Sequence, residues 1–173
     1  MAQNRGKQFE QVIRESFERV PGVSIDRLHD QMNGFKGSQN ICDFIVYKKP
    51  YEYYFECKSV HGTTLSIFGN DPKKKYGNIT NTQWEGLSQK SKIRGVAAGI
   101  ICWWIDYDET WYIPIRVLED ARNVMHSKSI NIRHPHMQGY WIPVIGNKKR
   151  VFFSYNMEAF LKGVSKDASK EYL

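Results

Sequence analysis

The stretch that decides the fold runs from Ile41 to Ser59 and reads ICDFIVY, then KKP, then YEYYFECKS. Two runs rich in β-branched and aromatic residues flank a Lys-Lys-Pro break, and this pattern predicts two neighbouring strands. Three charged residues, Asp43, Glu56 and Lys58, interrupt these apolar runs. A charge inside a strand is costly unless it is paired or binds a metal ion. The three residues are therefore the first candidates for a functional site.

Side chains alternate between the two faces of a strand, so Glu56 and Lys58 share one face and Cys57 points to the other. If the two strands pair in register, Asp43 joins Glu56 and Lys58 at one polar spot, with Cys42 and Cys57 buried behind it. Two carboxylates beside an ammonium group favour Mg²⁺, with Mn²⁺ as a second choice. The alternative is a surface ion pair on an edge hairpin, but the apolar neighbours favour internal strands.

Length and charge narrow the class of protein. The 173 residues suit a single domain, with its core at about 6–115, further strands and a closing helix at 116–164, and a charged tail at 165–173. The net charge of +7 favours acidic partners, nucleic acid before a membrane surface. We see no apolar run long enough to span a membrane and no apolar core of a signal peptide. Three widely spaced cysteines predict free thiols in a reducing compartment, hence a cytoplasmic protein of a bacterium or of a bacterial host cell.

The segments around the two strands supply further candidates. An amphipathic helix is expected from Lys7 to Val20, with Glu10 at the edge of its apolar stripe. Capping boxes at Thr80 and Thr82 start a second helix that runs to about Ile93 and carries Gln83 in its first turn, where Gln83 could simply cap the backbone. Several basic residues are candidates for contacts with DNA phosphates, although a solvated loop is the alternative for most of them: Lys7, Arg27, Lys36, Lys73, Lys74 and Lys75.

The second half of the chain alternates between strand and helix patterns. The run from Val96 to Ile105 is apolar throughout and predicts a central strand covered on both faces. The remaining expected elements are strands at 110–115, 140–145 and 150–155, a loop at 146–149, and helices at 117–125 and 156–164.

This order of elements resembles the PD-(D/E)XK nuclease superfamily, and more closely the RecU-type Holliday-junction resolvases and their phage relatives. The resemblance spans about residues 6–115, and Cys42 stands where the superfamily usually has proline. It is carried by Gly6-Lys7-x-Phe9-Glu10, Asp43-Phe44, Phe55-Glu56-Cys57-Lys58-Ser59, Gln83-x-x-x-Leu87 and Gly99-Ile100-Ile101.

The resemblance implies a restriction-endonuclease-like fold, a mixed β-sheet flanked by α-helices. It implies an Mg²⁺-dependent endonuclease that resolves four-way DNA junctions as a homodimer. Asp43, Glu56 and Gln83 would ligate the metal, Lys58 would stabilise the transition state, and we add Glu10 as a second metal contact. The alternatives are another nuclease of this fold, of the repair or restriction type, and a non-catalytic protein that binds DNA or a recombinase.

Overall fold

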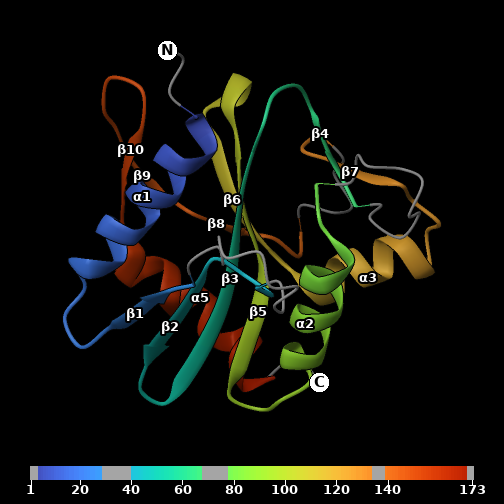
Figure 1. Ribbon diagram of the computed structural model, residues 1–173, viewed down its shortest axis with the longest axis horizontal. Helices are drawn as coiled ribbons and strands as arrows, with labels where there is room; N and C mark the ends of the chain where they lie inside the picture. Colours follow the sequence, from blue (N-terminus) through green and yellow to red (C-terminus); the bar gives the residue numbers. More distant parts are fainter. Residues whose placement is uncertain (1–3, 29–39, 68–77, 134–138, 171–173) are drawn as a thin grey trace, which may run out of the picture.

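The computed structural model describes residues 4–28, 40–67, 78–133 and 139–170 (Figure 1). Its helices are α1 (Arg5–Glu18), α2 (Asn81–Ser91), α3 (Ile115–Asn123) and α5 (Met157–Ser169), with a 3₁₀ turn at Ile105–Tyr107. Its strands are β1 (Ser24–Arg27), β2 (Phe44–Lys48), β3 (Tyr51–Val60), β4 (Thr64–Ser66), β5 (Val96–Trp104), β6 (Glu109–Pro114), β7 (Ser129–Asn131), β8 (Ile142–Pro143), β9 (Gly146–Lys148) and β10 (Phe153–Tyr155).

One mixed sheet organises these elements, with the strand order β1-β2-β3-β5-β6-β8. Strands β2 and β3 form the antiparallel pair expected from the Ile41–Ser59 stretch, and Phe44 lies opposite Phe55. Strand β3 then runs parallel to β5, which is buried along its whole length because helices cover both of its faces. The structure thus confirms the expected α/β architecture, a mixed β-sheet flanked by α-helices.

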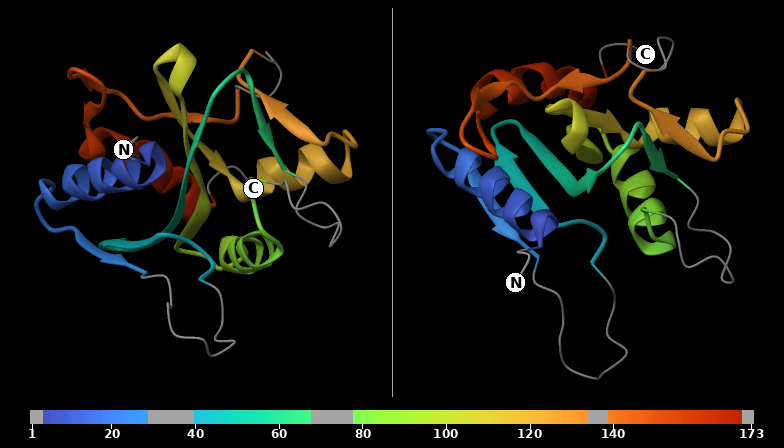
Figure 2. Two further views of the ribbon diagram at one scale, coloured as in Figure 1. Left: turned by 45° about the horizontal axis from the view of Figure 1, so that its top comes forward. Right: turned by 90° about the horizontal axis from the view of Figure 1, so that it is seen from above.

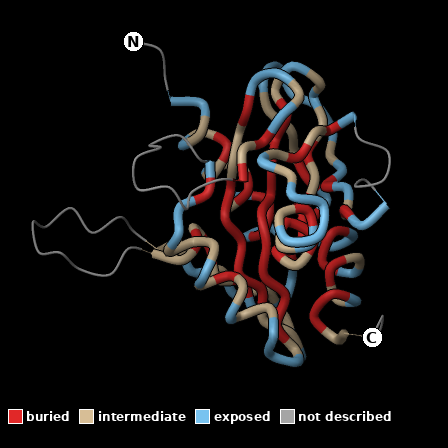
Figure 3. Tube along the Cα trace, turned by 90° about the vertical axis from the view of Figure 1, so that its right-hand side faces the viewer, coloured by how far each residue is buried: buried red, intermediate tan, exposed pale blue. Residues whose placement is uncertain are grey.

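The sheet separates two hydrophobic cores. On one face α1 and α5 pack through Phe9, Ile13, Phe17 and Phe160, and Phe17 stacks on Phe55 of β3 with ring centroids 5.7 Å apart. On the other face α2 and α3 pack against the same strands. The right-hand panel of Figure 2 shows α1 on one side of β3 and α2 with α3 on the other. Figure 3 shows the central strands as the most deeply buried part of the chain.

Three features of the structure depart from the sequence-based expectations. Strand β1 was not among the expected elements, and it pairs with β2 through residues such as Ile25. Strands β4 and β7 form a small second sheet in two other stretches without a strand pattern. The expectation of a charged tail from Ser165 is wrong for the residues up to Ser169. Helix α5 continues through Asp167 and Ala168, both of which are buried.

The expected strands at 140–145 and 150–155 are also largely wrong. Only Ile142–Pro143 joins the main sheet, because proline has no N–H to continue the ladder. The expected loop at 146–149 instead contains β9, which pairs with β10. At Gly146 a Cβ atom would come within 2.5 Å of the Ser154 carbonyl oxygen, so the close approach of these two strands requires glycine.

Candidate active site

Asp43 reaches the site because the β2–β3 ladder continues one residue beyond β2. Its N–H donates to the Phe55 carbonyl at 3.1 Å, and its Oδ2 accepts the Cys57 N–H at 2.8 Å. Since Phe44 lies opposite Phe55, Asp43 lies beside Glu56 on the same face of the sheet. The backbone of β3 therefore fixes the aspartate next to the glutamate.

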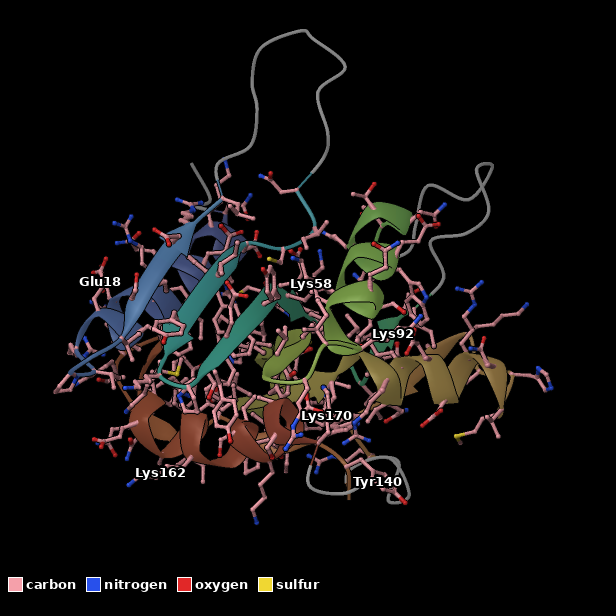
Figure 4. The ribbon with its side chains drawn as sticks, turned by 90° about the horizontal axis from the view of Figure 1, so that it is seen from below. Glu18, Lys58, Lys92, Tyr140, Lys162 and Lys170 are labelled. Atoms are coloured by element: carbon pink, nitrogen blue, oxygen red, sulfur yellow. The ribbon has the colours of Figure 1, made fainter. Side chains whose placement is uncertain are left out.

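Glu56 is the centre of the cluster. Its side chain is almost fully buried, and its Oε1 accepts hydrogen bonds from Lys58 Nζ and from Gln83 Nε2, both at 2.6 Å. Lys58 Nζ also lies 3.4 Å from Gln83 Oε1. Figure 4 shows the labelled Lys58 between the strands of the sheet and α2. The structure thus brings Asp43, Glu56, Lys58 and Gln83 together from two strands and one helix.

The first turn of α2 holds Gln83 in place. Of the two capping boxes read from the sequence, the structure uses the one at Thr80, whose hydroxyl oxygen accepts the Gln83 N–H at 3.2 Å. In return Gln83 Oε1 accepts the Thr80 N–H at 3.0 Å. The side chain of Gln83 therefore both caps the helix and donates to Glu56.

A glycine that sequence reasoning missed lets α2 approach the strands. A Cβ atom on Gly86 would lie 2.2 Å from Ile41 Cγ2, so any larger residue would push the helix away. Ile41 stands two residues before Asp43 in the sequence. Glycine destabilises the interior of a helix, so a glycine at position 86 of the expected helix could have indicated a close packing contact there.

Burial is the largest cause that raises the pKa of both carboxyl groups. Burial, followed by the neighbouring Asp43, raises the pKa of Glu56 to about 8 against the opposing effect of Lys58. Burial also raises the pKa of Asp43 to about 6, although the hydrogen bond from the Cys57 N–H opposes it. The ammonium group of Lys58 therefore lies beside one buried and one half-buried acid, and a further cation would be stabilised beside them.

Glu10 lies close to the cluster but faces a different partner. Its Oε2 accepts a hydrogen bond from Arg27 Nη2 of β1 at 2.8 Å, and its charge contributes to the raised pKa values of Asp43 and Glu56. Arg27, expected to contact DNA, thus holds the carboxylate expected to contact a metal. Lys7 is exposed on α1, one turn before Glu10. The remaining candidates for DNA contacts lie outside the described residues, namely Lys36, Lys73, Lys74 and Lys75.

The donor set fits a hard divalent cation of the Mg²⁺ type. Among the described residues no group of three His, Cys, Asp or Glu side chains is placed to hold a metal ion, and Asp43 and Glu56 form a pair of acidic donors. Mg²⁺ is usually bound by one or two carboxylates and retains several waters. Gln83 would have to release the Thr80 N–H before its carbonyl oxygen became a ligand.

The cysteines contribute no ligand to this cluster. All three are free thiols and buried, as expected. Both Cys42 and Cys57 are buried as expected, but only Cys57 lies behind the acidic residues, in the core under α1, whereas Cys42 belongs to the core under α2. Cys42 precedes β2, so strand alternation does not extend to it. Burial raises the pKa of its thiol to about 12, which keeps the sulfur protonated.

Comparison with known proteins finds similarity of fold among solved structures. No protein-family model and no curated protein sequence matches the chain. In the part of the chain that the structure describes, every helix is too short or too polar to cross a membrane. Among solved structures, the chain is similar in fold to Hjc, a Holliday junction resolvase from the hyperthermophilic archaeon Archaeoglobus fulgidus. The TM-score is 0.48 and the identity 16%, over 73% of this chain and 88% of that one.

Proposed function

We propose that this protein is a metal-dependent endonuclease that hydrolyses phosphodiester bonds in DNA. One observation carries the proposal. The buried carboxylate of Glu56 lies beside the half-buried carboxylate of Asp43, the ammonium group of Lys58 pairs with Glu56, and burial raises the pKa of Glu56 to about 8. Such an arrangement is expensive for the fold unless a cation completes it. In a nuclease active site, both the cation and the lysine would take part in catalysis.

Each residue has a separate task in this scheme. Asp43 and Glu56 would hold Mg²⁺, which when bound offsets phosphate charge and lowers the pKa of a nearby water. Lys58, held by Glu56 and Gln83, would donate to a phosphate oxygen and offset the charge that develops in the transition state. Gln83 would orient Glu56, and Glu10 would assist from the edge of the site after Arg27 turns to the DNA.

The narrower proposal concerns the substrate and the assembly. The family resemblance favours a RecU-type resolvase that cuts four-way junctions. The net charge of +7 supports binding to nucleic acid. Resolution requires two cuts at symmetry-related positions, and the described residues contain one candidate site, so a homodimer with a two-fold axis supplies the second. Sedimentation should give the mass of a dimer at working concentration, and a monomer that cuts duplex as readily as junction would exclude the resolvase assignment.

A cleavage assay tests the nuclease proposal. Labelled four-way junction, duplex and single-stranded DNA are incubated with Mg²⁺, with Mn²⁺ or with excess EDTA. Cleavage is expected with either metal and is expected to stop in EDTA, with the junction as the preferred substrate. Preference for duplex would favour a repair or restriction enzyme, whereas binding without cleavage under every condition would favour the non-catalytic alternative.

A further inference from the structure

A strongly basic surface lies at the end of the sheet away from the candidate active site. Three segments form it: the β2–β3 turn at 47–52, the turn after α2 at 90–95 and the exposed face of α5 at 158–166. They contain two carboxylates, Glu52 and Glu158, and a larger set of cationic side chains, which we call the basic end: Lys48, Lys49, Lys90, Lys92, Arg94, Lys162 and Lys166. With seven cations and two carboxylates, the three segments carry a net charge of +5.

Backbone contacts hold the three segments together. The Glu52 N–H donates to the Gly95 carbonyl at 3.0 Å, and the Gly95 N–H donates to the Ala168 carbonyl at 2.9 Å. Lys48, Lys49 and Lys162 line a common pocket of about 140 Å³ beneath the β2–β3 turn. Figure 4 looks onto this end of the molecule and labels Lys92 and Lys162. The basic end is therefore one surface, although its members are far apart in the sequence.

The cations of the basic end are unpaired within the described part of the chain. None of the seven lies within 4.0 Å of a described carboxylate oxygen, whereas Arg14, Arg133 and Lys148 elsewhere on the surface each form an ion pair. Lys90 instead lies over the ring of Tyr54, with its Nζ 4.7 Å from the centroid. Concentrated like charge of this kind repels itself and is compensated when a polyanion binds.

Helix ends account for only part of this charge. Lys90 and Lys166 lie in the last turns of α2 and α5, where a cation stabilises the helix dipole. Lys92, the C-cap residue of α2, is explained in the same way. Lys49 is exposed in the β2–β3 turn and Lys162 is exposed in the middle of α5, so the explanation does not extend to these two. Their position calls for a ligand outside the chain.

We propose that the basic end binds the phosphate backbone of a duplex arm of the DNA substrate at a distance from the site of cleavage. This inference rests on the proposed function. Five residues of β3 separate Glu56 from Tyr51 at the turn, about 17 Å at the rise of an extended strand. Duplex DNA carries a charge for about every 1.7 Å of its axis, so an arm that leaves the active site presents phosphates over that whole distance. The basic end provides affinity and the active site provides the chemistry.

Paired triple variants with the same loss of charge test the inference. The first replaces one exposed lysine from each segment (Lys49→Ala, Lys92→Ala, Lys162→Ala). The control replaces three exposed cations outside the basic end (Lys128→Ala, Lys149→Ala, Arg150→Ala). Affinity for a junction with long arms is measured in EDTA against salt concentration, and thermal unfolding verifies that both variants fold.

The basic-end variant should show a flatter plot of log affinity against log salt, by up to about 0.9 for each lost phosphate contact. The control variant should keep the wild-type slope. Equal slopes in the two variants would overturn the inference. Selective loss of binding to phosphatidylserine vesicles, with the DNA slope unchanged, would overturn it in favour of a membrane partner. Because binding is measured in EDTA, absence of cleavage by the wild type in Mg²⁺ would refute the nuclease proposal separately.

Discussion

Glu56 and Asp167 are equally buried, with 3% of each residue exposed, yet their surroundings differ. Asp167 accepts hydrogen bonds from the Tyr112 hydroxyl at 3.0 Å and from Arg116 Nε at 3.2 Å. The guanidinium group of Arg116 faces this carboxylate and Lys170 also lies near it, so its negative charge is compensated. Glu56 shares its ammonium partner with a second acid, Asp43, so negative charge is in excess. Burial is common to both clusters, and only the excess of charge marks the Glu56 cluster as a site for a cation.

The largest difference between the two clusters should appear in cleavage. Glu56→Gln and Asp43→Asn should each abolish it while leaving DNA binding intact, because the basic surface is unchanged. Asp167→Asn should cleave normally but lower the free energy of unfolding by about 1–3 kcal/mol, since it weakens a buried charge-assisted hydrogen-bond network. Junction cleavage and urea denaturation of the three variants measure these effects. Cleavage by Glu56→Gln at the wild-type rate would remove the distinction between the clusters.

The second largest difference between the Glu56 and Asp167 clusters should appear in how protein stability changes with pH. A carboxylate whose pKa is raised on folding binds more protons in the folded than in the unfolded state, so stability falls as pH rises between the two values. For Glu56 this interval runs from its ordinary pKa of 4.5 to about 8, and for Asp43 from 3.8 to about 6. The metal-free wild type should therefore lose stability relative to Glu56→Gln between about pH 5 and about pH 9.

The measurement compares the urea unfolding midpoints of the wild type and Glu56→Gln in EDTA at about pH 5 and at about pH 9. Mg²⁺ should restore stability to the wild type more strongly at the higher pH, because the cation replaces the missing protons. A wild type that gains stability over Glu56→Gln as the pH rises would show that the charge of Glu56 is already compensated by its neighbours.

The smallest predicted effect concerns Gln83, which belongs both to the helix cap and to the acidic cluster. Gln83→Ala should lower stability by about 1 kcal/mol and cleavage by about 10- to 100-fold, as expected when a group that orients a ligand is lost. Thr80→Ala is the matched control, because it removes the capping hydroxyl and leaves the Gln83 amide in place. Equal cleavage by the two variants would indicate that Gln83 acts only as a cap.

The sequence was informative where local chemistry decides the structure. Two runs rich in β-branched and aromatic residues around a Lys-Lys-Pro break predicted the β2–β3 pair. Alternation of side chains, with the strands paired in register, predicted that Asp43 and Glu56 share a face. The Thr80 capping box predicted the start of α2 and the place of Gln83. In each case the interacting residues are close in sequence or lie on two adjacent strands.

Contacts between segments that lie far apart in the chain could not be predicted from local sequence patterns. The pairing of Glu10 with Arg27 depends on how α1 docks beside β1, and the burial of Asp167 depends on Arg116 from another helix. Read alone, Asp167 belonged to a charged tail. Strand β1 has too few apolar residues for a strand pattern and is defined by pairing with β2. In each of these cases a tertiary partner, absent from the local pattern, determines the outcome.

Binding of Mn²⁺ tests the excess of negative charge most directly. Calorimetric titration of Mn²⁺ into the DNA-free protein should show a binding site in the wild type and in Asp167→Asn. The same titration should show that site lost in Glu56→Gln and in Asp43→Asn, which remove one negative charge each from the cluster. Equal Mn²⁺ binding by the wild type and Glu56→Gln would contradict the account, because the cation would then be held by other residues.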